Sequence, residues 1–197
     1  VSEQKPVVLV DRYFPDLETS YVTVDNFKGA TGGVELLIKK GYKKIGLITL
    51  DSMQVQMMER ERGYNVTLEK SKINVGAEMI LRIPYDMNYG NTVKAISDFL
   101  RKEKDIDGLF FTTNYLGVAG LESIRALGKK IPGEIGIVCF DDSDLFRLGS
   151  PSISVVAQPI RAIGEKAVDI IIDMLTSEIM DPQQIIIEPT IIEREST

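Results

Sequence analysis

Polar side chains follow four of the strands that the sequence predicts, at the points where those strands end. They combine hydroxyl, amide and carboxylate groups with aromatic and methionine side chains: Asp51-Ser52-Met53, Tyr85-Asp86, Thr113-Asn114 and Asp141-Asp142. In open α/β sheets a ligand binds beyond the carboxyl ends of the strands, so a binding site is expected at these positions. The mixture suits a small polyol or heterocycle that needs both hydrogen bonds and an apolar face.

Enzymatic chemistry at these strand ends stays open as an alternative. Glycoside hydrolysis needs two carboxylates, and Asp51, Asp86 and Asp141 are available, although nothing in their spacing singles out an acid and a base. The sequence has no His, which excludes His-based triads and His-liganded metals. The Asp-rich run 141–144 lacks the distal Glu of a calcium loop. We therefore expect neither a metal nor a cofactor.

The elements that position these groups alternate along the chain. A β-branched run, a polar turn and an amphipathic stretch recur, a pattern typical of parallel strands linked by helices. The predicted strands are 7–10, 21–24, 44–50, 79–83, 108–112, 135–140, 153–156 and 184–189. The predicted helices are 26–40, 55–70, 91–104, 115–127 and 160–176. The sequence thus predicts an α/β fold.

Glycine and cysteine have structural explanations here. The glycine-rich run 29–33 lies inside a predicted helix and lacks both the dinucleotide-binding spacing and a phosphate-loop Lys-Ser/Thr pair. Close packing of that helix explains the glycines better. Cys139, the only cysteine, lies in an apolar run, so it forms no internal disulfide and is expected to be buried.

The charge of the chain argues against nucleic acid as a direct partner. The net charge is −6, and Lys and Arg are scattered among acids, whereas DNA rewards clustered positive charge. No apolar run approaches the roughly 18 residues of a membrane-spanning helix, and the first residues lack a secretory signal pattern. We expect a cytoplasmic protein without a membrane partner.

Several ordered segments resemble the family of the lactose and galactose repressors. They span nearly all of the chain, in the order and spacing of that family: 6–12, 24–26, 41–46, 60–64, 111–114, 131–142, 154–159 and 193–196. One departure is Gly41-Tyr42, where the family usually has Gly-His.

The resemblance implies a periplasmic binding protein-like fold of type I, with helices on both faces of a parallel sheet, preceded in the family by a helix-turn-helix head. On this basis we expect a fragment without the head and most of the first lobe. The expected ranges are a first-lobe remnant (1–19), the effector-binding second lobe (20–153), a return to the first lobe (154–180) and a second-lobe tail (181–197). The function implied is binding of a sugar-like effector between the lobes, which modulates operator DNA binding by the full-length protein, expected to be a homodimer. A solute-binding protein of a sugar transport system is the alternative, and an enzyme is less favoured.

The family's effector contacts carry over by position onto Arg60, Asn114 and Asp141, with weaker cases for Gln158 and Ile160 at the lobe junction. Tyr115 replaces a family acidic residue and offers a stacking face. Met53 lies in a Met-rich stretch that suits either an irregular core or an adaptable binding surface. The predicted effector contacts are therefore Met53, Arg60, Asn114, Tyr115, Asp141, Gln158 and Ile160.

Three of these residues have structural alternatives. Arg60 lies in the run Glu59-Arg60-Glu61-Arg62 and is open to simple pairing with its neighbours on a solvated helix face. Asn114 precedes a predicted helix and is a candidate cap. Asp141 opens an Asp-rich turn, where an Asx turn is the alternative to ligand binding.

Overall fold

Two sheets organise the part of the chain that the structure, a computed structural model, describes: residues 5–73, 76–176 and 181–197. The larger sheet has six strands, side by side in the order β4 (Ile80–Pro84), β3 (Ile45–Asp51), β5 (Gly108–Phe111), β6 (Gly136–Phe140), β7 (Ser154–Ala157) and β9 (Thr190–Ile192). The smaller sheet has the order β1 (Val8–Val10), β2 (Ser20–Val24) and β8 (Gln184–Ile187). Neighbouring strands are parallel, except that β7 and β9 are antiparallel.

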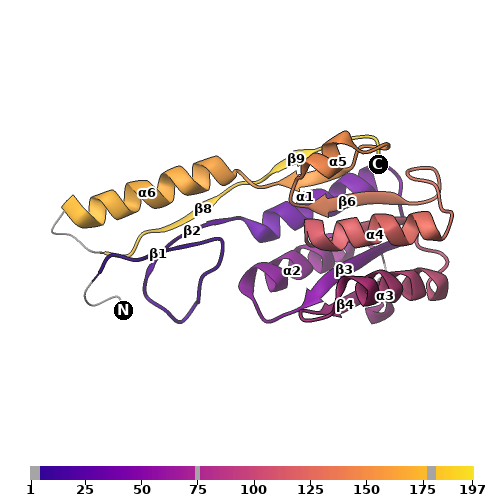
Figure 1. The fold of residues 1–197 in the computed structure, drawn as a ribbon, viewed down its shortest axis with the longest axis horizontal. Coiled ribbons are helices and arrows are strands. Elements are labelled where there is room, and N and C mark those ends of the chain that lie inside the picture. Colours follow the sequence, from indigo (N-terminus) through magenta and orange to yellow (C-terminus); the bar gives the residue numbers. More distant parts are fainter. Residues whose placement is uncertain (1–4, 74–75, 177–180) are drawn as a thin grey trace.

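The larger sheet lies between two pairs of helices (Figure 1). One pair is α1 (Asn26–Lys39) with α2 (Val55–Lys70), and the other is α3 (Tyr89–Lys102) with α4 (Asn114–Ala126). Strands buried on both faces are typical of parallel sheets covered in this way, and every residue of β5 and β6 is buried. The predicted α/β fold with helices on both faces is confirmed.

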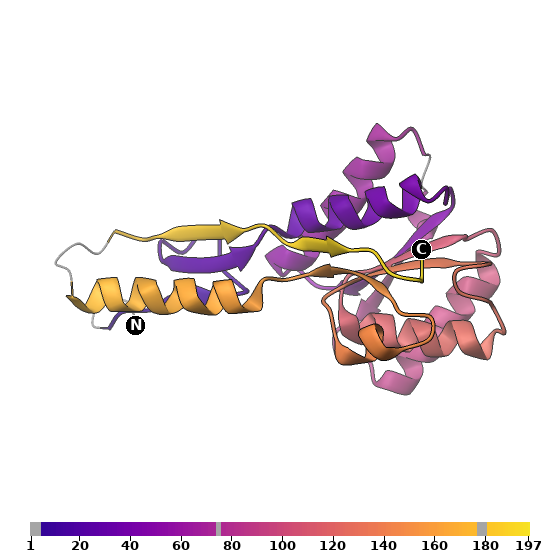
Figure 2. The same cartoon turned by 90° about the horizontal axis from the view of Figure 1, so that it is seen from above.

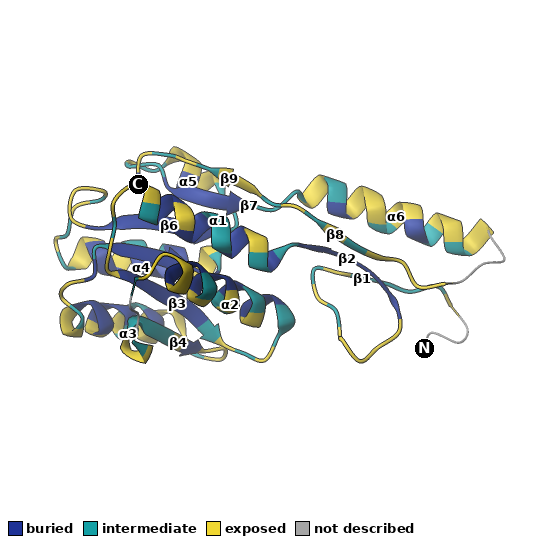
Figure 3. Cartoon of the chain, turned by 180° about the vertical axis from the view of Figure 1, so that it is seen from behind, coloured by how far each residue is buried: buried dark blue, intermediate teal, exposed yellow. Residues whose placement is uncertain are grey.

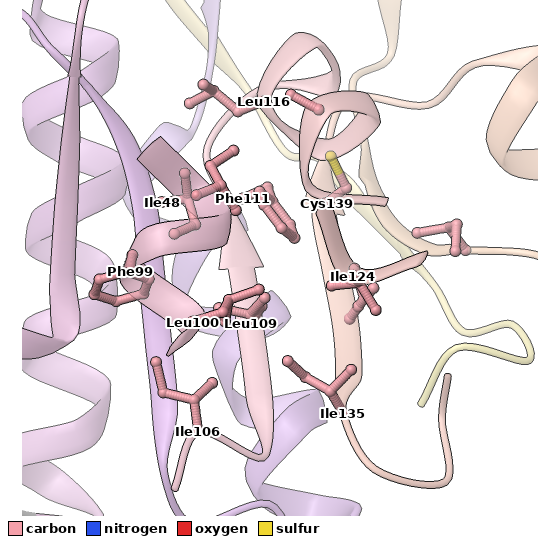
Figure 4. Close-up of a cluster of buried hydrophobic side chains, with 14 of the residues drawn as sticks. Ile48, Phe99, Leu100, Ile106, Leu109, Phe111, Leu116, Ile124, Ile135 and Cys139 are labelled. Carbon is pink, nitrogen blue, oxygen red and sulfur yellow. The ribbon is translucent and has the colours of Figure 1, made fainter. Parts of the chain in front are cut away.

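Side chains that alternate along the strands divide the core into two clusters. Phe111 and Cys139 belong to the cluster beneath α3 and α4, which Figure 4 shows, whereas Phe110 and Val138 face α1 and α2. Successive side chains of a strand point to opposite faces, so adjacent residues supply both cores. Cys139 is buried, as predicted.

The glycines of α1 allow that helix to lie close to the sheet. A Cβ atom added at Gly29 would lie 2.8 Å from the Phe140 ring, and one added at Gly33 would lie 2.8 Å from the Phe110 ring. Real Cβ atoms do not approach so closely, so only glycine permits this contact. The predicted packing role of the glycine-rich run is confirmed.

The sequence missed three short elements. They are η1 (Ala77–Met79), α5 (Asp144–Leu148) and strand β9. The strand predicted over 184–189 ends at Ile187, and the chain then passes to the other sheet, where Thr190 begins β9. Pro189 lies in this passage, which fits because proline cannot donate to a strand ladder.

A smaller unit extends from the six-stranded body, as Figure 2 shows. It consists of β1, β2, β8 and α6 (Ile160–Thr176), which packs on β1 and β2. The outer face of α6 is largely exposed (Figure 3). No helix in the described ranges is long and apolar enough to cross a membrane.

The sheets divide the chain at points other than the expected domain boundaries. Strands β2 and β8 fall in the ranges expected for the second lobe, but they belong to the smaller sheet, where β2 pairs with both β1 and β8. Strand β7 was expected in the return segment but pairs with β6 in the larger sheet. The physical reason is strand pairing. The chain passes from one unit to the other only after a strand has ended, so the strand ends set the boundaries between the units.

Three crossings join the two units, and they are neighbours. They run from β2 to α1, from β7 to α6 and from β8 to β9. The Asp25 amide donates to the Ile187 carbonyl (2.8 Å), which links the first crossing to the third. Ala157 pairs with Thr190, which links the second to the third. The β8–β9 crossing therefore lies between the other two.

Candidate functional site

An open cavity of about 500 Å³ lies where the two units meet. Its walls come from the end of β1, the start of α4, the end of β6 and the junction of β7 with α6: Val10, Asp11, Asn114, Asp141, Asp142, Gln158, Ile160, Ile163 and Gly164. This volume is within the range of pockets that hold small ligands. Four of the seven predicted contact residues, Asn114, Asp141, Gln158 and Ile160, line it together.

Asp141 is held in a fixed orientation at the centre of this wall. It follows β6 with a φ of 73°, and its amide donates to the Val156 carbonyl (3.0 Å). Its Oδ1 accepts a hydrogen bond from Gln158 Nε2 (2.5 Å). The local turn contact is made by Asp142, whose Oδ1 accepts from the Ser143 amide (2.8 Å). The Asp141 carboxylate is thus held by Gln158 across the junction, and Asp141 faces the cavity.

Arg60 lies behind Asp141, almost wholly buried at 2% exposure. Its Nε donates to Asn26 Oδ1 (2.8 Å) and its Nη1 donates to the Thr112 carbonyl (2.6 Å). The guanidinium also stacks on Phe140, with its Cζ 3.6 Å from the ring centroid. Burial lowers the pKa of Arg60, and the charges of Asp141 and then Asp11 oppose that shift. An arginine remains charged in proteins, so the site contains a buried cation.

The surface-pairing alternative for Arg60 is wrong. Glu59 pairs with Arg62, and Glu61 pairs with Arg82 on β4. Arg60 points instead between α1 and the ends of β5 and β6, because its position on α2 faces the sheet. Whether it contacts a ligand directly stays a prediction, since the cavity wall is formed by Asp141 in front of it.

The capping alternative for Asn114 is also wrong. The cap of α4 is Thr113, whose Oγ1 accepts from the Leu116 amide (3.2 Å). Asn114 is the first residue of the helix, and it lines the cavity. Its amide is therefore available to donate to and accept from a ligand.

Gln158 and Ile160 extend the site across the junction of the two units. Gln158 follows β7 and holds the Asp141 carboxylate. Ile160 begins α6 and is 77% exposed, so it gives the cavity an apolar wall.

Two predicted residues lie elsewhere. Tyr115 makes an edge contact with Tyr89, with ring centroids 6.0 Å apart, and is not among the residues that line the cavity. It lies on another side of α4 because successive helical residues are rotated by about 100°. Met53 is 85% exposed and lines a different cavity, together with residues 12–15.

Sequence reasoning missed Asp11 as a wall residue, and it placed Asp142 at a strand end without including it among the predicted effector contacts. Asp11 has a φ of 67° and follows β1, so the strand-end rule that selected Asp141 also applied to it. Asp142 accepts from Arg194 at 2.6 and 2.8 Å. Its pKa is lowered chiefly by that Arg194 contact. Only the fold reveals this partner near the end of the chain.

The described residues contain no group of three or more His, Cys, Asp or Glu side chains placed to hold a metal ion. Two of the carboxylates considered for hydrolysis are also separated. Asp51 lines a cavity beside α2 and β4, whereas Asp141 lines the cavity between the two units.

Comparisons with known proteins agree with this architecture. The model of the family described as periplasmic binding protein-like domain matches residues 34–197. The HTH-type transcriptional regulator CelR of Thermobifida fusca is 28% identical over 183 residues, which cover 92% of this chain and 53% of the relative. The ribose operon repressor of Haemophilus influenzae is 27% identical over 191 residues, 97% of this chain and 57% of the relative.

A solved complex of the regulator CelR with cellobiose superposes with a TM-score of 0.87 at 27% identity, and covers 96% of this chain and 58% of that one. The chain thus spans little more than half the length of these relatives.

Proposed function

The chain belongs to the family of periplasmic binding protein-like domains, and on this premise we propose that it is the ligand-sensing part of a bacterial transcription regulator. The named relatives are transcriptional regulators, so the resemblance to the lactose and galactose repressors is confirmed. A role in transport is not favoured, because these relatives regulate transcription. We infer a regulatory role in place of an enzymatic one, since the named relatives are transcriptional regulators.

The observation that carries the proposal is the set of polar groups in the cavity between the two units. The Asp141 carboxylate accepts hydrogen bonds from hydroxyl groups, and the Asn114 amide both donates and accepts. Ile160 and Ile163 offer an apolar face to the carbon side of a ring. This combination fits a sugar or sugar derivative, the class to which cellobiose, bound by the relative CelR, belongs.

Arg60 is a positioning residue in this scheme. It lies 3.8 Å from the Asp141 carboxylate and is fixed by Asn26 and the Thr112 carbonyl. The buried guanidinium and Gln158 together fix the position of the carboxylate that faces the cavity. Asp141 then offers the effector a hydrogen-bond acceptor at a fixed place.

The effector would act through the hinge between the units. A ligand that bridges the walls on both sides shifts the balance between their arrangements by its differential affinity for them. We assign the six-stranded sheet to the second lobe, and we assign β1, β2, β8 and α6 to the first lobe. Operator DNA would be bound by another part of the full-length protein, a cytoplasmic homodimer, since this chain has a net charge of −6.

The experiment that tests the proposal is a dose response of operator binding by the full-length protein to a panel of saccharides. Asp141→Ala should abolish the response and leave operator binding intact. The matched control is Asp144→Ala, because the Asp144 side chain is 84% exposed on α5 and lies outside the cavity. A normal dose response in the Asp141 variant would refute the site.

A further inference from the structure

A second cavity has a volume of about 400 Å³. One wall is residues 12–15 from the segment between β1 and β2, and the other is residues 52–56 at the start of α2. The two walls come from the two different units of the fold. This cavity therefore has the same relation to the hinge as the cavity that contains Asp141.

The side chains of the second cavity suit a sugar ring. Phe14 is 66% exposed and Met53 is 85% exposed, so neither is needed by the core. Tyr13 stacks on Tyr21, with ring centroids 4.2 Å apart at 12°, which fixes its orientation. Aromatic faces and a flexible thioether suit the C–H faces of a sugar. The polar groups of the wall include the amides of Gln54 and Gln56, where Gln56 Nε2 donates to Gln54 Oε1 (3.3 Å).

The two cavities are lined or supported by nearby residues of two elements. Asp11 lines the first cavity, and the next residue, Arg12, lines the second. On α2, Gln56 of the second cavity lies one turn, about 6 Å, before Arg60, which contacts Asp141 of the first.

The segment that carries Tyr13 lies against α2. The pKa of Tyr13 is raised by burial, by Tyr21 and by Glu59, and Glu59 is a residue of α2 one position before Arg60. The second cavity is thus held at the same end of α2 that supports Asp141.

We propose that the second cavity is a second subsite of the effector site, so that this chain recognises a disaccharide. One ring would bind at Asp141 and Asn114, and the other would lie against Phe14 and Met53. The proposal rests on the proposed function of the chain as a sugar sensor. It adds the size of the effector, and it gives Met53 a role that the first cavity does not supply.

The test is calorimetric titration of the full-length protein with saccharides matched in pairs. Cellobiose and maltose are compared with glucose, and lactose is compared with glucose and galactose. We expect one disaccharide to bind at least roughly tenfold more tightly than either component sugar, because the contacts of the second ring increase the affinity by about that factor. Phe14→Ala and Met53→Ala should weaken disaccharide binding about fivefold or more each and leave monosaccharide binding unchanged.

The matched control is Leu148→Ala, because Leu148 is 74% exposed and lines neither cavity. Its saccharide affinities should equal those of the unmodified protein, and all three variants should keep its melting temperature.

The outcomes separate the two proposals. A monosaccharide that binds as tightly as the disaccharides, and whose binding is lost in Asp141→Ala, would overturn the second subsite and leave the sensor function standing. Unchanged disaccharide affinity in both Phe14→Ala and Met53→Ala would do the same. If no saccharide of either length bound, both proposals would be overturned.

Discussion

Arg60 Nη1 lies 3.8 Å from Asp141 Oδ2, so a buried cation stands directly behind the carboxylate that faces the cavity. The pair joins α2 to the end of β6, two elements that are far apart in the sequence. The carboxylate is also held by Gln158, which leads into α6. The Asp141 side chain therefore connects the core of the larger unit to the segment that leads into α6 of the smaller unit.

Arg60→Ala should destabilise the protein by about 3 kcal/mol, since it leaves buried partners of the guanidinium unsatisfied. Arg60→Lys should recover only part of this loss, because an ammonium lacks the planar fork that serves Asn26 and Thr112 at once. Urea unfolding measures both values. The control is Arg62→Ala, whose ion pair with Glu59 is exposed and worth less than about 1 kcal/mol. Equal losses in the Arg60 and Arg62 variants would contradict the buried role.

Gly29→Ala should destabilise the protein by about 1–3 kcal/mol, because the new methyl group would meet the Phe140 ring. Gly164→Ala is the matched control. It is also a helical glycine, but no atom lies within 4 Å of its added Cβ, so this change should be neutral or stabilise by about 0.5–1 kcal/mol. The melting temperature should fall in Gly29→Ala and stay the same or rise in Gly164→Ala, and an equal fall in both variants would refute the packing argument.

Thr113→Ala should cost about 1 kcal/mol, because it removes the side-chain oxygen that caps α4. Thr113→Ser keeps that oxygen and should recover most of the loss. Asn114→Ala should have a much smaller effect on the free energy of unfolding, since Asn114 does not cap the helix. A larger loss in Asn114→Ala than in Thr113→Ala would restore the capping interpretation of Asn114.

Stability should depend on the ionisation of Asp142 in acid. The Arg194 guanidinium lowers the pKa of Asp142 in the folded protein, so the unfolded chain binds the proton more readily. The contribution is complete above the unfolded pKa of about 4, and it is lost as pH falls through the lower folded pKa. Urea unfolding of Asp142→Asn from pH 6 to pH 3 should show a shallower fall than the unmodified protein. Parallel curves would show that the pair contributes nothing.

The sequence predicted the long elements well because their patterns are local. Helix α6 runs over Ile160–Thr176, as its apolar spacing indicates, and α2 runs over Val55–Lys70, the predicted range. Strand β9 is three residues long and depends on pairing with β7, so no local pattern marks it. The passage from the smaller sheet to the larger sheet after Ile187 also depends on strand pairing, so no local pattern marks it.

The candidate site was predicted in part. Asp141 and Asn114 follow buried strands and were found by that rule, which also reaches Asp11 after the short strand β1. The burial of Arg60 was not predictable from alternating charges, because the side of α2 that faces the sheet depends on packing with α1. Met53 also follows a strand, yet the turn into α2 directs it to the second cavity.

The three neighbouring crossings have a mechanical consequence. A body tethered to another at three adjacent points keeps one principal degree of freedom, which is rotation about the row of tethers. Helix α6 begins at this row and extends for 17 residues, about 25 Å, so it acts as a lever arm. A rotation of about 10° would move its far end by roughly 4 Å, so a much smaller displacement between the cavity walls near the axis is amplified at the far end of the helix.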